Sequence, residues 1–122
     1  MKFLSMIRIQ ENTGQKPSER LMNEMGKLMA EMTKDGSLVS TGGLRPTAEG
    51  KRVRSTFGKL SVKDGPFTES KEVIGGYAIL EARSMEHAIE LTRRFLEVHG
   101  DEWNVECEVR PFDGPEFGAR AG

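Results

Sequence analysis

Residues 75–100 read GGYAILEARSMEHAIELTRRFLEVHG and predict a strand followed directly by a helix. Residues 77–83 come after two glycines and have a strand-like pattern. Ser84 is a favoured helix N-cap residue, and Gly100 is a favoured helix stop. Between these two residues, side chains that fit one buried helix face recur at helical spacing: Met85, Ala88, Ile89, Thr92, Phe95, Leu96 and His99.

The N-terminal part of the chain predicts the same order of elements. Residues 2–10 are an apolar-rich run that is too short for a buried helix and ends in turn-forming residues, so we expect a strand. Residues 18–34 predict a helix, because Pro17 suits the start of a helix and Gly36 the end. Its apolar stripe contains four methionines, which we expect to fill gaps in the core: Leu21, Met22, Met25, Leu28, Met29 and Met32.

Three further segments complete the expected architecture. Residues 37–44 predict a short strand, residues 52–63 a hairpin-like arm, and residues 105–112 a last, cleanly alternating strand. The order is therefore strand, helix, strand, hairpin, strand, helix, strand. This order is that of the split βαβ or ferredoxin-like plan, so we predict an α+β fold in which both helices cover one face of an antiparallel sheet.

The faces of the expected sheet predict a second subunit. By strand alternation, the face toward the helices carries Phe3, Ile7, Ile9, Ala78, Leu80, Ala82, Val105, Cys107 and Val109. The other face mixes apolar and charged residues: Leu4, Met6, Arg8, Tyr77, Ile79, Glu81, Arg83, Glu106, Glu108 and Arg110. This mixture is too apolar for open water and too charged for a dry core. We therefore predict a homodimer whose two sheets enclose a partly hydrated pocket.

Length, charge and residue usage exclude several classes of protein. A chain of 122 residues fits one domain, placed here at 1–112, with a flexible tail over 113–122. A net charge of -1 lacks the basic excess of a general nucleic-acid binder. No signal peptide or membrane span is visible, so we expect a cytoplasmic protein without a membrane partner. His87, His99 and Cys107 do not form a metal motif, and we expect neither a metal nor another cofactor.

Three segments together resemble a known family. Residues 64–77 read DGPFTESKEVIGGY, residues 39–46 read VSTGGLRP, and residues 108–112 read EVRPF. This ordered set resembles the DGPF subgroup of YCII-related proteins. The resemblance implies a dimeric α+β barrel and a cytoplasmic bacterial protein, often encoded beside extracytoplasmic-function sigma factors. Some YCII relatives use a His–Asp pair, and Asp35 matches the acid, whereas residues 18–34 contain no histidine and Met25 lies near its expected place.

Two hypotheses for the function follow from these observations. In the first, the homodimer binds a small anionic or aromatic metabolite in a pocket between sheet and helices, with a lining of Met6, Arg8, Met25, Asp35, Tyr77 and Glu81. Arg8 or Arg110 anchors the anion, Tyr77 packs on it or hydrogen-bonds it, and Phe67 caps the pocket mouth. If the protein is an enzyme, Asp35 or Glu81 is the catalytic acid–base group for cofactor-free lyase or isomerase chemistry.

The second hypothesis is a regulatory or interaction module that contacts a sigma factor. Its contact surface would be the arm of residues 52–63 together with the loop at Phe67. The exposed alternating pattern of the arm and the missing histidine favour this alternative.

Overall fold

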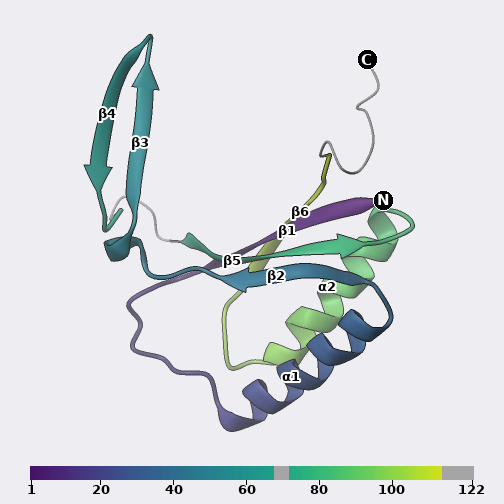
Figure 1. The fold of residues 1–122 in the computed structure, drawn as a ribbon. Coiled ribbons are helices and arrows are strands. Elements are labelled where there is room, and N and C mark those ends of the chain that lie inside the picture. The colour runs from purple at the N-terminus through teal and green to yellow at the C-terminus, as the bar shows by residue number, and fades with distance from the viewer. Residues whose placement is uncertain (68–71, 114–122) are drawn as a thin grey trace.

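A computed structural model, which describes residues 1–67 and 72–113, has the expected α+β architecture. The described strands form a four-stranded antiparallel sheet in the order β2-β5-β1-β6 and a separate two-stranded sheet of β3 and β4. Both helices cover one face of the larger sheet (Figure 1). The elements are β1 (Lys2–Ile9), α1 (Glu19–Lys34), β2 (Leu38–Gly43), the 3-10 helix η1 (Thr47–Glu49), β3 (Lys51–Thr56), β4 (Lys59–Asp64), β5 (Val73–Glu81), α2 (Met85–His99) and β6 (Glu106–Pro111).

The core lies between the larger sheet and the helices. Phe3, on β1, pairs with Leu80 on β5, and both side chains are buried beneath the helices. Met32 and Ala88 reach the same cluster from α1 and α2. Because side chains alternate along a strand, the burial of Phe3 and Leu80 turns Leu4 and Ile79 toward the opposite face. The predicted division of the sheet into two faces is therefore confirmed for β1 and β5.

Local capping fixes where each helix begins. The Ser18 hydroxyl accepts a hydrogen bond from the Leu21 amide, and the Ser84 hydroxyl accepts one from the His87 amide, each at 3.1 Å. The predicted apolar stripe of α1 is confirmed along the middle line of this helix face, where Leu21, Leu28 and Met32 are buried. Met22 is an exception: it is 62% exposed, because it lies at the margin of the stripe.

Gly75 and Gly76 were expected to precede a strand over 77–83, and this boundary is wrong. They lie inside β5, which begins at Val73 and ends at Glu81. The reason is the close approach of β2: a Cβ atom at position 76 would lie 2.9 Å from the Gly42 carbonyl oxygen. Gly75 is the extra residue at a bulge opposite β1, where Ile7 pairs with Gly76 and Arg8 with Ile74.

β3 and β4 form an arm that stands away from the rest of the molecule on the side opposite the helices (Figure 1). The predicted hairpin is confirmed, and it does not join the larger sheet. Its two strands are linked by Phe57 and Gly58, whose φ angles of 49° and 89° are those of a tight type I′ turn. The tail predicted over 113–122 lies, apart from Asp113, outside the described residues.

The helices leave the second face of the larger sheet uncovered (Figure 1); we call it the open face. It includes Leu4, Met6, Tyr77 and Ile79, which are half-buried within a single copy of the chain. Neither α1 nor α2, the long helices of the described part, has the length and apolar character needed to cross a membrane.

Candidate functional site

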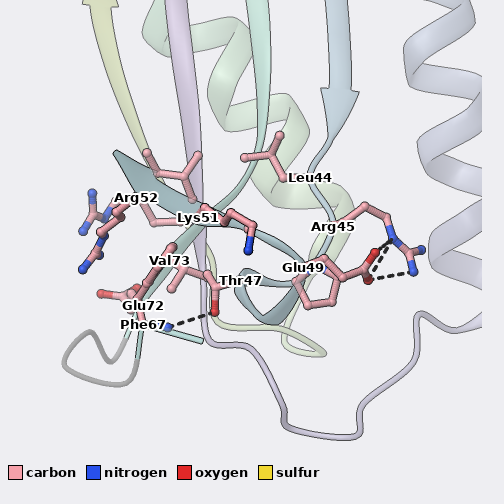
Figure 2. A pocket seen from close by; sticks show the side chains of 13 residues that line it. Leu44, Arg45, Thr47, Glu49, Lys51, Arg52, Phe67, Glu72 and Val73 are labelled. Atoms are coloured by element: carbon pink, nitrogen blue, oxygen red, sulfur yellow. Dashed lines mark hydrogen bonds and ion pairs between the residues drawn. The ribbon is translucent and has the colours of Figure 1, made fainter. Parts of the chain in front are cut away.

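A pocket of about 510 Å³ lies at the end of the larger sheet from which the arm emerges (Figure 2). This volume is in the range of small-molecule sites. The pocket is bounded by the end of β1, the loop that contains η1, the base of β3, and the segment that leads into β5. The described residues that line it are Arg8, Leu44, Arg45, Pro46, Thr47, Glu49, Gly50, Lys51, Arg52, Phe67, Glu72, Val73 and Ile74.

Most of the charged groups around the pocket already have partners. Arg45 pairs with Glu49 at 2.9 Å, and Lys51 pairs with Asp64 at the base of the arm. The Arg52 guanidinium lies 4.0 Å from the centroid of the Phe67 ring, a cation–π contact. Arg8 differs from these residues: it is half-buried, and it has no ion pair or hydrogen-bond partner among residues 1–67 and 72–113.

The DGPF segment, residues 64–67, builds one wall of this pocket. The Gly65 amide donates a hydrogen bond to the Gly50 carbonyl at 3.0 Å, which joins the two ends of the arm. Gly65 also packs directly on the Thr47 carbonyl and leaves no room for a Cβ atom. The Gly65–Pro66 peptide bond is cis, and the Phe67 amide then donates to the Thr47 hydroxyl at 3.4 Å. The segment thus holds the Phe67 ring in the pocket lining.

Thr47 is the residue on which these loops converge. The Glu11 carboxylate accepts hydrogen bonds from the Thr47 hydroxyl and from the Thr47 amide, the latter at 3.1 Å. These bonds lower the pKa of Glu11 from its ordinary value and keep the group ionised. The loop after β1, η1 and the DGPF segment are therefore held together through one side chain.

The structure brings two of the predicted site residues, Arg8 and Phe67, into this pocket. Met6 and Tyr77 pair across β1 and β5 on the open face, and the Tyr77 hydroxyl lies 3.3 Å from the Ser40 hydroxyl. Arg110 lies on the exposed edge strand β6, 3.8 Å from Glu108. These three residues are not in the pocket lining.

The predicted acid–base residues Asp35 and Glu81 lie at the opposite end of the sheet. Strand pairing places Glu81 beside Lys2. Lys2 is six residues along β1 from the pocket residue Arg8, so Glu81 lies about 20 Å from Arg8. Hydrogen bonds from Lys2 and from the N-terminal ammonium group lower the pKa of Glu81 to about 2. Asp35 caps the C-terminus of α1 and accepts hydrogen bonds from the Ser37 hydroxyl and amide, which lower its pKa.

The space between sheet and helices, where a pocket was expected, is filled by side chains. The cavity that remains there is about 30 Å³ and is lined mainly by apolar groups such as Met32 and Leu80. Met25 packs against this core from α1. The described residues also contain no group of three or more His, Cys, Asp or Glu side chains that could hold a metal ion. Burial raises the pKa of the Cys107 thiol, which disfavours the reactive thiolate form.

Sequence reasoning missed the contributions of Thr47, Gly50 and Lys51 to the pocket. A usable signal was present, because the segments 39–46 and 64–77 flank both ends of the arm. A hairpin brings its two ends together, so residues just outside those ends must meet.

Comparison with known proteins adds a family and a relative. A family model described as the YCII-related domain matches residues 1–112. An uncharacterized protein of Rhizobium meliloti (strain 1021), R00369, is 28% identical over 93 residues, which is 76% of this chain and 73% of that protein.

The packing of Gly65 on Thr47 yields a first prediction. We expect Gly65→Ala to lower the free energy of unfolding by about 1–3 kcal/mol and to speed amide exchange in β3 and β4, because the methyl group forces the two ends of the arm apart. Urea denaturation and hydrogen exchange measure these effects. Gly43→Ala is the matched control, since a Cβ atom there meets nothing within 4 Å. Equal losses in both variants would contradict this role of Gly65.

The lowered pKa of Glu81 yields a prediction for acid stability. Because the carboxyl titrates near 4.5 when unperturbed and at about 2 in the folded chain, its stabilising effect is complete above pH 4.5 and is lost as the pH falls toward 2. We expect Glu81→Gln to reduce the pH dependence of the unfolding free energy across this window in untagged protein. Glu90→Gln, at an exposed position of α2, serves as the control. An unchanged pH profile for Glu81→Gln would refute the assignment.

Proposed function

The chain belongs to the family of YCII-related domains. We propose that it is a homodimer, and that it binds a small anionic metabolite in the pocket at the base of its arm. The observation that carries the proposal is Arg8. Arg8 is half-buried, and no ion pair or hydrogen bond from residues 1–67 or 72–113 offsets the cost of removing its guanidinium from water; a bound anion would offset that cost. Carboxylate and phosphate groups both match the geometry of a guanidinium.

The rest of the lining favours a ligand that also has an apolar part. Leu44, Val73 and Ile74 contribute aliphatic surface to the pocket. The Phe67 ring adds an aromatic surface, although one side of it is occupied by the Arg52 guanidinium. An aromatic or branched aliphatic acid satisfies both conditions, with its acid group on Arg8 and its body on the apolar wall.

The open face supports the homodimer. Leu4, Met6, Tyr77 and Ile79 form an apolar group on this face, since Leu4 pairs with Ile79 and Met6 with Tyr77. The helices lie on the other side of the sheet (Figure 1). The charged side chains of the edge strand β6 lie on one side of this group, so that a facing copy of the same sheet would meet both apolar and charged partners. Sedimentation of the purified chain at micromolar concentration tests the association.

The proposal is one of binding, and it does not require a reaction. The sequence hypothesis of cofactor-free proton transfer by Asp35 or Glu81 would need a ligand site near those residues, at the end of the sheet away from this pocket. Proton transfer at the pocket itself would fall to Glu49 or Glu72, which are the carboxylates that residues 1–67 and 72–113 contribute to its lining. Glu49 is already paired with Arg45, which leaves Glu72 as the better placed of the two.

The exposed arm supports a second candidate function, an interaction module that contacts an extracytoplasmic-function sigma factor. Phe57 is 104% exposed at the tip of the arm, and Leu60 is 77% exposed beside it. Apolar groups exposed in this way are common at protein contacts. Binding of purified sigma factor that is lost on deletion of residues 52–63 would favour this candidate.

The role of Arg8 predicts the outcome of a ligand screen. We expect benzoate or inorganic phosphate at millimolar concentration to raise the melting temperature of the wild-type chain, and we expect Arg8→Ala to remove that rise because the anion loses its charge partner. Arg8→Lys should retain part of it. Arg93→Ala, at an exposed position of α2, is the control and should respond like the wild type. The proposal fails if no small carboxylate or phosphate raises the melting temperature, or if Arg8→Ala responds undiminished.

A further inference from the structure

The β3–β4 arm has two chemically different faces. Strand pairing places Val53 opposite Val62 and Ser55 opposite Leu60, and residues directly opposite each other share a face. Alternation puts the arm's cations, apart from Lys51, on the other face: Arg52, Arg54, Lys59 and Lys63. The arm is thus an amphipathic ribbon with one apolar and one basic face.

The apolar face of this ribbon lacks cover within a single copy of the described chain. Val53 is 72% exposed, Val62 62% and Leu60 77%. An isolated two-stranded hairpin is at best marginally stable in water, because it has no layer on which to bury its side chains. A contact that buries this face would stabilise the arm in the conformation seen here.

The tip of the arm presents a further unusual feature. Phe57 has a φ angle of 49°, in the left-handed region, where a bulky side chain is strained. Asparagine or aspartate is the usual residue at this position of a type I′ turn. The turn instead holds a fully exposed aromatic ring at the tip of the arm. Exposed aromatic groups of this kind act as anchors in protein interfaces.

We propose that the arm clasps a second copy of this chain and lies along that copy's β6 edge. The inference rests on the proposed homodimer, in which the open faces of two copies meet. Six residues in each strand give the arm a length of about 20 Å. The arm stands on the open-face side of the larger sheet (Figure 1). Because facing sheets pack about 10 Å apart, an arm of this length would extend past the plane of the partner's sheet.

Charge selects β6 rather than β2 as the edge that the arm meets. These two strands are the edges of the larger sheet. On its open face β2 presents Ser40 and Gly42, which are uncharged, whereas β6 presents Glu106 and Glu108. Arg110 also lies on β6, 3.8 Å from Glu108, and leaves the open face of this strand with one net negative charge.

The two faces of the ribbon can act together at this edge. A two-stranded ribbon is only about 5 Å wide, so long side chains on its far face reach around its margins. In this arrangement the apolar face covers the edge strand of the partner, and Arg54 and Lys59 bend toward its glutamates. Contact with the arm also shields an edge whose backbone groups could otherwise pair with other chains.

A charge-exchange experiment on the full chain tests the proposal. One variant carries Arg54→Glu and Lys59→Glu, and a second carries Glu106→Lys and Glu108→Lys. Each variant alone places like charges at both arm contacts of its dimer, so we expect dimerisation at least about tenfold weaker than in the wild type. When the two variants are mixed, both contacts join opposite charges. We therefore expect heterodimers in excess over both homodimers, measured by native mass spectrometry.

The apolar face is tested separately. Leu60→Ser should weaken the wild-type dimer, whereas Ile89→Ser should not. The expectation that Ile89 lies on the buried face of α2 is wrong, because its side chain is 42% exposed. A control pair, Lys16→Glu with Arg93→Glu, reverses two exposed charges outside the arm and should leave dimerisation unchanged. Circular dichroism of each variant checks that the chain is folded.

The outcomes separate this inference from the function on which it rests. If the wild-type chain sediments as a monomer at micromolar concentration, the homodimer and the clasp both fail. If the wild type is a dimer but the charge variants and Leu60→Ser dimerise as tightly as the wild type, the clasp fails while the homodimer stands. If the mixed variants show no preference for heterodimers, the arm does not meet β6. Weakened homodimers together with preferred heterodimers support the clasp.

Discussion

The burial of one face of the sheet beneath two helices decides where the other features of this protein lie. Phe3 has no exposed surface, and the cavity left in this layer is about 30 Å³, so ligand-sized space has to be found outside it. That space occurs where β1, β2 and β5 run into loops. The same burial places one set of alternating strand side chains against the helices, so the other set lies on the open face. The pocket, the open face and the position of the arm are therefore linked consequences of a single packing arrangement.

The regular elements could be predicted from the sequence because each depends on residues close together in the chain. Ser18 and Ser84 cap helices through amides three residues away. The pocket could not be predicted in this way, because Thr47 joins Glu11 and Phe67 across separations of 36 and 20 residues. Alternation assigned Arg8 and Glu81 to the open face, but it does not say which end of a strand faces a cavity. The register of β1 against β5 decides which end each residue occupies. It pairs Glu81 with Lys2 at one end of the sheet and places Arg8 at the other end, in the pocket lining.

The DGPF segment illustrates how a turn sequence acquires a second role. Its residues have turn chemistry, as the sequence indicates. In the folded chain it also closes the base of the arm and carries an aromatic ring into the lining of the pocket. The contact between Gly65 and Thr47 requires the absence of a side chain, which is a constraint that arises only when two distant loops meet. Composition alone cannot distinguish this requirement from the ordinary preference of turns for glycine.

The closed base of the arm makes its length independent of the rest of the fold. The Lys51–Asp64 ion pair and the hydrogen bond from Gly65 to Gly50 join its two ends, and no described strand of the larger sheet pairs with it. Insertion of two residues in each strand would lengthen the ribbon without moving the pocket, and it would preserve which side chains lie on which face. Insertion of a single residue in each strand would exchange the apolar and basic faces beyond that point. Relatives of this chain can therefore be expected to differ in arm length by even steps while the loops at its base stay the same.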